Sequence, residues 1–122
     1  MNTTFQELWQ KRDLMRDFIP NEKTAIDVVN ELSSSRGWRE RYYAAEVVAA
    51  FSLIQYVPKL IETFKANPEP HTCRAFVKMV SQTLGNEGLE LLNEMKTASL
   101  GDPRSPVMLK EIENAIQQIK AA

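Results

Sequence analysis

Apolar residues recur along most of the chain at spacings of three and four, which is the period of an amphipathic helix. The pattern predicts seven helices, whose apolar positions run from Phe5 to Ile19, Ala25 to Leu32, Ala44 to Phe51, Leu60 to Phe64, Cys73 to Leu84, Leu89 to Met95 and Leu109 to Ile119. No alternating run is bounded by turn signals on both sides, so we expect no sheet. The periodicity therefore predicts an all-α fold.

Helix-breaking residues separate these segments. Pro20 ends the first helix, and Ser33–Gly37 breaks the chain after the second. Pro58 suits the first turn of a helix, because the amide hydrogen that it lacks has no intrahelical partner there. Asn67–Pro70 predicts a turn, and Gly85 stops the fifth helix. All the breaks are too short for an interdomain linker, which indicates a single domain.

The helices pair up, and the pairs superimpose as an internal repeat. The first helices of the pairs share apolar positions at offsets of 32 and 31 residues: Val28, Val29 and Leu32, then Leu60, Ile61 and Phe64, then Leu91, Leu92 and Met95. The second helices do so at offsets of 33 and 35 residues: Ala44, Val47 and Phe51, then Val77, Val80 and Leu84, then Ile112, Ala115 and Ile119. The alternative is an unrelated helical bundle whose spacing matches by chance.

The repeat divides the single domain of residues 1–122 into four parts. We expect an N-terminal capping helix over 1–20 and repeats over 21–54, 55–85 and 86–122. Each helix pair has too much apolar surface to be stable alone, and stacking buries a continuous core. Terminal units should carry polar outer faces, and the last helix has suitable residues: Lys110, Glu111, Glu113, Asn114, Gln117, Gln118 and Lys120.

The paired pattern resembles the short HEAT-like repeats, whose second helix opens with Val-Arg-x-x-Ala-x-x-Ala-Leu. The matching segments are Arg41–Phe51 and Cys73–Val80, whereas Leu109 or Lys110 stands where the third repeat would have Arg. The resemblance covers roughly residues 24–120. It implies a short right-handed α-α superhelix, a HEAT-like solenoid of about three helix pairs plus the capping helix. It also implies that Arg41 and Arg74 support a neighbouring turn.

Composition and charge limit the classes of ligand and the cellular compartments that fit this protein. The 122 residues carry a formal net charge of −1, so bulk attraction to nucleic acid or anionic membrane is not expected. The single cysteine makes no internal disulfide. No apolar signal segment opens the chain, and the apolar-rich stretch 44–54 contains Glu46 and is too short to span a bilayer. We therefore expect a cytoplasmic protein without membrane contact.

Residues that carry chemistry are sparse. The four glycines form no phosphate-binding motif, and His71 and Cys73 are the only residues of their types. A spacing of two residues is poor for a metal site, and it directs a nucleophile and a base apart on a helix. Glu87, Glu90 and Glu94 form a helical stripe typical of a solvated face. We expect no cofactor, no metal and no enzymatic activity.

A candidate binding surface follows the second helices of the pairs, since curvature makes that side of a helical solenoid concave. Its residues are rich in Trp, Tyr and Arg, the types that dominate interface hot spots: Trp38, Arg39, Tyr42, Tyr43, Glu46, His71, Arg74 and Lys78. We expect the surface to continue through Lys110, Glu113, Asn114 and Gln117. The alternative is that Trp38 and one tyrosine pack on the preceding helix.

Three function classes fit these features. The first is a non-enzymatic protein-binding scaffold or inhibitor, such as an immunity-type protein that neutralises a toxin, by analogy of fold and size. The second binds nucleic acid through a basic stripe interrupted by Glu40 and Glu46, made of Arg36, Arg39, Arg41, Arg74 and Lys78. The third is an enzyme related to HEAT-like lyases, or its accessory subunit. We expect a monomer, or a weak homodimer formed through the apolar side of the first helix.

Overall fold

Every secondary-structure element in residues 4–122, which the computed structural model describes, is helical. None of the helices in that range has the length and apolarity that a bilayer crossing requires. The elements are α1 (Phe5–Gln10), η1 (Arg12–Leu14), α2 (Met15–Phe18), α3 (Glu22–Leu32), α4 (Trp38–Phe51), η2 (Ile54–Tyr56), α5 (Val57–Ala66), α6 (Pro70–Thr83), η3 (Gly85–Gly88), α7 (Leu89–Ser99) and α8 (Ser105–Ala121). The predicted all-α class is confirmed for this range.

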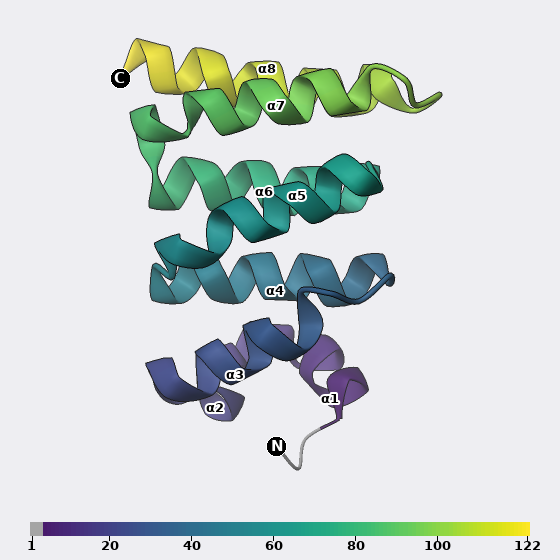
Figure 1. Cartoon of the computed structure of the whole chain (residues 1–122). Helices are drawn as coiled ribbons and strands as arrows, with labels where there is room; N and C mark the ends of the chain where they lie inside the picture. The colour runs from purple at the N-terminus through teal and green to yellow at the C-terminus, as the bar shows by residue number, and fades with distance from the viewer. Residues whose placement is uncertain (1–3) are drawn as a thin grey trace.

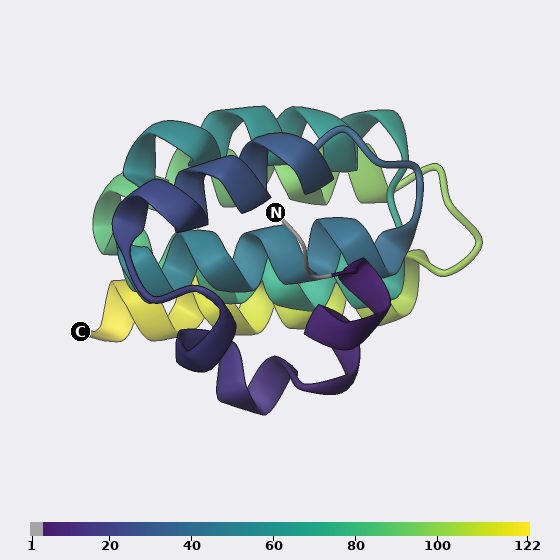
Figure 2. The ribbon, with the colours of Figure 1, turned by 90° about the horizontal axis from the view of Figure 1, so that it is seen from below.

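The long helices form two layers. Figure 1 shows the helices stacked from the N-terminal to the C-terminal end of the chain, with α5 in front of α6 and α7 in front of α8. Figure 2 shows α3, α5 and α7 on one side and α4, α6 and α8 on the other. Within the second layer α6 contacts both α4 and α8, so these three helices present one continuous face.

Local residues explain where these helices begin and end. The Asn21 side chain accepts a hydrogen bond of 2.9 Å from the backbone N–H of Thr24 and caps α3. The Glu69 carboxylate caps α6 in the same way. Ser52 (φ 54°) and Gly85 (φ 53°) follow α4 and α6 in the left-handed region, which ends a helix. The predicted end at Gly85 agrees with this geometry, and Ser52 fixes the end of α4, which the sequence left open.

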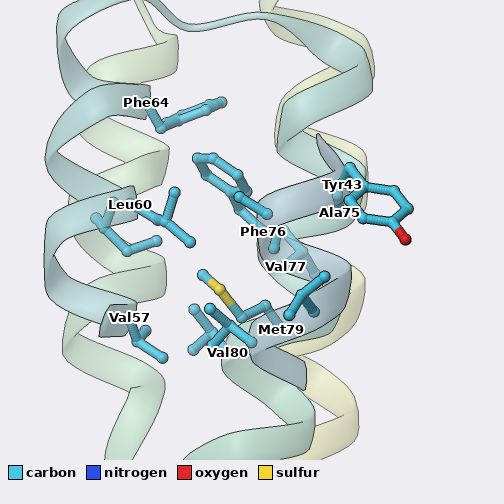
Figure 3. Packing of buried hydrophobic residues seen from close by; sticks show 14 of the residues in the cluster. Tyr43, Val57, Leu60, Phe64, Ala75, Phe76, Val77, Met79 and Val80 are labelled. Carbon is cyan, nitrogen blue, oxygen red and sulfur yellow. The ribbon is translucent and has the colours of Figure 1, made fainter. Parts of the chain in front are cut away.

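The core is centred on α6, which contacts α4, α5, α7 and α8. The rings of Phe64 on α5 and Phe76 on α6 lie 6.1 Å apart in an edge-to-face arrangement, and neither is exposed to solvent. Figure 3 shows Leu60 and Val57 of α5 facing α6 in the same layer of side chains. The apolar spacing that marked the repeat on α5 is therefore the spacing of its buried stripe.

The N-terminal segment differs from the single helix predicted over Phe5–Ile19. It is broken after Gln10 into α1, the short η1 and α2, and it lies against α4 on the side away from α3 (Figure 2). The Arg16 guanidinium donates to the Ala50 carbonyl (2.9 Å) and lies 3.9 Å from the Phe51 ring centroid. The break allows the segment to bend along α4 and contact both of its ends.

The two arginines of the HEAT-like motif have different environments. Arg41 is 2% exposed, and its Nη1 donates to the Thr63 carbonyl near the end of α5 at 3.5 Å, consistent with support of the neighbouring turn. Arg74 is exposed instead, and its guanidinium forms no hydrogen bond to a turn within residues 4–122. Arg104 supports the turn before α6, because its Nη2 donates to the Pro68 carbonyl at 3.1 Å.

Candidate functional site

A groove crosses the face formed by α4, α6 and α8, and we name it the α4–α6–α8 groove. It has a volume of about 490 Å³. All three helices contribute to its lining: Tyr42, Glu46, Arg74, Ala75, Val77, Lys78, Ser81, Gln82, Glu111, Asn114, Ala115 and Gln118. The face of the second helices is therefore hollowed, and four of the candidate residues line the groove: Tyr42, Glu46, Arg74 and Lys78.

A smaller hollow of about 160 Å³ adjoins one end of this groove, and we name it the arginine–aromatic pocket. Its lining is Trp9, Arg12, Trp38, Tyr42, His71 and Arg74. Tyr42 and Arg74 line both hollows, so the pocket and the groove form one continuous surface. The sequence placed four of the six pocket residues on the candidate surface.

The aromatic rings of the pocket hold one another in edge-to-face contacts. The ring of Trp9 lies 5.6 Å from the ring of Trp38 and 5.6 Å from the ring of Tyr42, with interplanar angles of 89° and 81°. Trp38 and Tyr42, one helical turn apart on α4, are 6.2 Å apart. Such pairs are favourable beyond the area they bury, so the walls of the pocket are preorganised.

The flat faces of both tryptophans carry other side chains. His71 stacks on Trp38 with 4.1 Å between ring centroids, and Arg39 lies 4.8 Å from the same ring. The Arg12 guanidinium lies 4.4 Å over the Trp9 ring and donates to the Trp9 carbonyl at 2.8 Å. Arg39 thus packs against the Trp38 ring and lines neither the groove nor the pocket.

Glu46 gives the groove a half-buried acidic group. Burial raises its pKa, although Lys78 and Arg12 oppose that shift. Its Oε1 is covered and has no hydrogen-bond partner in residues 4–122. Glu46 and Lys78 also line a second hollow of about 190 Å³ between α2, α4 and α6, so both lie at the junction of two depressions.

Two predicted parts of the surface are corrected by the structure. Tyr43 is fully buried, because α1 covers that side of α4 and places the Phe5 ring edge-to-face at 6.2 Å. On α8 the groove is lined by Glu111, Asn114, Ala115 and Gln118. Of the predicted continuation, therefore, only Asn114 reaches the groove, while Lys110, Glu113 and Gln117 do not.

The predicted basic stripe is also interrupted in space. Arg41 is buried, and Arg36 lies at a separate hollow of about 230 Å³ between the α3–α4 loop and the end of α5. Arg74 and Lys78 lie instead at the α4–α6–α8 groove. The five cations do not form one surface.

Sequence reasoning missed Trp9 and Arg12, which the capping segment brings into the pocket. Trp9 was assigned to the apolar side of a straight helix, and Arg12 carried no signal. Both reach the pocket because α1 ends at Gln10 beside the first turns of α4. No local pattern encodes that placement, since it depends on contacts between segments about 30 residues apart in the chain.

Cys73 and His71 lie in environments unsuited to joint catalysis. The Cys73 thiol is buried and faces the Met108 carbonyl at 3.8 Å, and burial raises its pKa to about 12. Nδ1 of His71 lies 2.6 Å from Oε1 of Glu69. A buried thiol that stays protonated is a poor nucleophile. Across residues 4–122, no three His, Cys, Asp or Glu side chains gather as a metal site would require.

Because of Tyr43, we expect the free energy of unfolding to decrease at alkaline pH. Burial, with a smaller contribution from Glu46, raises its pKa from 10.0 to about 12. As the pH rises from 8 to 11, the unfolded chain releases this proton first, so stability falls by about 1.4 kcal/mol from this group. Tyr43→Phe should remove that part of the decline in urea unfolding curves. At pH 7 the variant should be nearly neutral, since the Tyr43 hydroxyl has no hydrogen-bond partner among residues 4–122. An unchanged pH profile would contradict the assignment.

No family model, curated protein or solved structure matches this chain. The functional argument therefore rests on the geometry and charge of the described residues.

Proposed function

We propose that the protein is a non-enzymatic binding module that holds another protein along the α4–α6–α8 groove and the arginine–aromatic pocket. In this proposal the helix pairs form a short HEAT-like solenoid, and the face of α4, α6 and α8 is its concave side. The module acts as an adaptor or an inhibitor. An immunity-type inhibitor of a toxin is the most specific version, and it rests on analogy of size and fold.

The observation that carries the proposal is the composition of the pocket. Two tryptophans, one tyrosine and two arginines meet at the end of a groove. These residue types supply most binding energy at protein interfaces, because they bury large areas with little loss of conformational entropy. The edge-to-face contacts hold the rings in place, so a partner does not have to order them.

The same contacts disfavour the nucleic-acid alternative. Proteins that bind single strands stack bases on free aromatic faces. Here His71 and Arg39 lie against Trp38, and Arg12 lies over Trp9. The acidic side chains of Glu46 and Glu111 also line the groove that a phosphate backbone would follow. A protein partner is compatible with both features.

Affinity capture from the source organism tests this function. Three tagged baits are compared with nuclease present: the wild type, Arg74→Glu with Lys78→Glu, and the control Lys59→Glu with Lys120→Glu. Lys59 and Lys120 are exposed and lie outside the groove. We expect one stoichiometric protein with the wild type and the control, and its loss with the groove variant. Equal recovery by all three baits, or recovery that nuclease abolishes, contradicts the proposal.

A further inference from the structure

Two guanidinium groups line the arginine–aromatic pocket. They belong to Arg12 of η1 and Arg74 of α6, and no carboxylate is part of the lining. Across residues 4–122 neither guanidinium lies within ion-pair distance of a carboxylate, whereas the pairs Lys65–Glu62, Lys65–Glu94, Lys96–Glu113 and Arg104–Asp102 do occur in that range. Two like charges at one small hollow repel each other unless an anion lies between them.

Two acidic groups close to the pocket, Glu69 and Glu46, do not line it, although burial, which raises the pKa of Glu46, is opposed by the charge of Arg12. Glu69 accepts hydrogen bonds from the backbone N–H groups of His71 and Thr72 at 2.8 and 2.7 Å, and its Oε1 also meets the His71 ring. Burial alone would raise the pKa of Glu69, but these bonds hold it below its usual value. Glu46 lies in the neighbouring groove. Neither of these two carboxylates lies inside the pocket.

The size and walls of the pocket suit a small planar anion. Its volume of about 160 Å³ exceeds the roughly 30 Å³ that one water occupies, so a carboxylate with its methylene group can enter. The three rings hold one another edge-to-face, so the aromatic walls of the hollow are fixed before a ligand enters. Guanidinium groups bind carboxylates through two parallel hydrogen bonds.

We propose that the arginine–aromatic pocket receives an aspartate or glutamate side chain of the protein partner, an inference that rests on the proposed function. The acidic side chain lies between Arg12 and Arg74, and the chain that carries it continues along the α4–α6–α8 groove. The carboxylate thereby fixes the register of the partner on the surface.

Intrinsic fluorescence tests this inference without the natural partner. The chain has two tryptophans, and both line the pocket, so any change in emission reports on this site. The probes are acetylated, amidated hexaglutamate, the matching hexaglutamine and a hexamer of oligothymidylate, titrated at low salt. We expect a saturable change with hexaglutamate and none with the other two. Arg74→Glu should weaken the hexaglutamate response at least about tenfold, because it reverses a charge at the binding site.

Controls separate this inference from folding and from the proposed function. Arg12→Gln is a second pocket variant, and Lys59→Glu is a charge-matched variant outside the pocket that should respond like the wild type. Circular dichroism checks that each variant is helical. A hexaglutamate response that is absent, or unchanged in both pocket variants, overturns the inference, as does tighter binding of oligothymidylate. The inference can fail while affinity capture still recovers a protein whose binding depends on the groove. In that case the proposed function stands, and only the binding of a carboxylate in the pocket is contradicted.

Discussion

Replacing Phe76 by Ala is expected to lower the free energy of unfolding by about 3–5 kcal/mol. Phe76 is fully buried on α6, the helix that contacts α4, α5, α7 and α8, and its ring packs against Phe64 (Figure 3). Truncation removes apolar contacts and leaves a cavity that surrounding helices fill only in part. The loss is a large fraction of the stability of a typical domain, so urea unfolding should show a strongly reduced midpoint.

Leu100→Ala is the control for this measurement. Leu100 is 60% exposed at the end of α7, so its truncation should change stability by less than about 0.5 kcal/mol. Similar effects of the two substitutions would mean that α6 is not the centre of the core.

Replacing Trp38 and Tyr42 by Ala together is expected to abolish binding of the captured protein partner. Each ring contacts Trp9 in the pocket, and Tyr42 also lines the groove. Aromatic hot spots contribute about 2 kcal/mol or more each, which corresponds to a loss of roughly 30-fold per residue. Isothermal titration calorimetry with the purified partner measures the change.

The matched control is Leu100→Ala with Val107→Ala. These two apolar residues are 60% and 59% exposed and lie outside the groove and the pocket. The control should bind like the wild type, and circular dichroism should show helical content in both double variants. Unchanged binding by the Trp38 and Tyr42 variant contradicts our assignment of the surface.

The helices were predictable because their buried stripes are strongly periodic. On α5 the apolar residues Val57, Leu60, Ile61 and Phe64 recur at three and four and are all buried. The ends of two helices followed from local chemistry. The Asn21 side chain can cap the start of a helix, and Gly85 can adopt the left-handed φ that ends one. Elements of this kind need no information from the rest of the chain.

The N-terminal segment could not be predicted, because tertiary contacts decide its shape. Its apolar residues fit one straight helix, yet the chain bends after Gln10 to pack along α4. That bend covers Tyr43 and brings Trp9 and Arg12 to the pocket. The full burial of Tyr43 and the partial burial of Tyr42 thus depend on a segment far away in the sequence.

The residue types of the candidate site could be predicted from the sequence, but the residues at its edges could not. Trp38 and Tyr42 were identifiable because their spacing places them together on one helix. The sequence assigned the wrong residues of α8 to the groove. The polar side of an amphipathic helix is wide, and several rows of polar residues on it could face the groove. The actual stripe, which includes Glu111 and Gln118, is set by how α8 packs on α6.

Photo-crosslinking tests the central claim, that the α4–α6–α8 groove binds a protein, most directly. A benzophenone amino acid is placed at position 78, in the groove, or at position 93, in a separate hollow of about 520 Å³ between α5 and α7. The two tagged proteins are irradiated in cells of the source organism, and their adducts are identified by mass spectrometry. Our account predicts one discrete protein adduct from position 78 and none from position 93. Adducts from position 93 alone, or the same adducts from both positions, would contradict it.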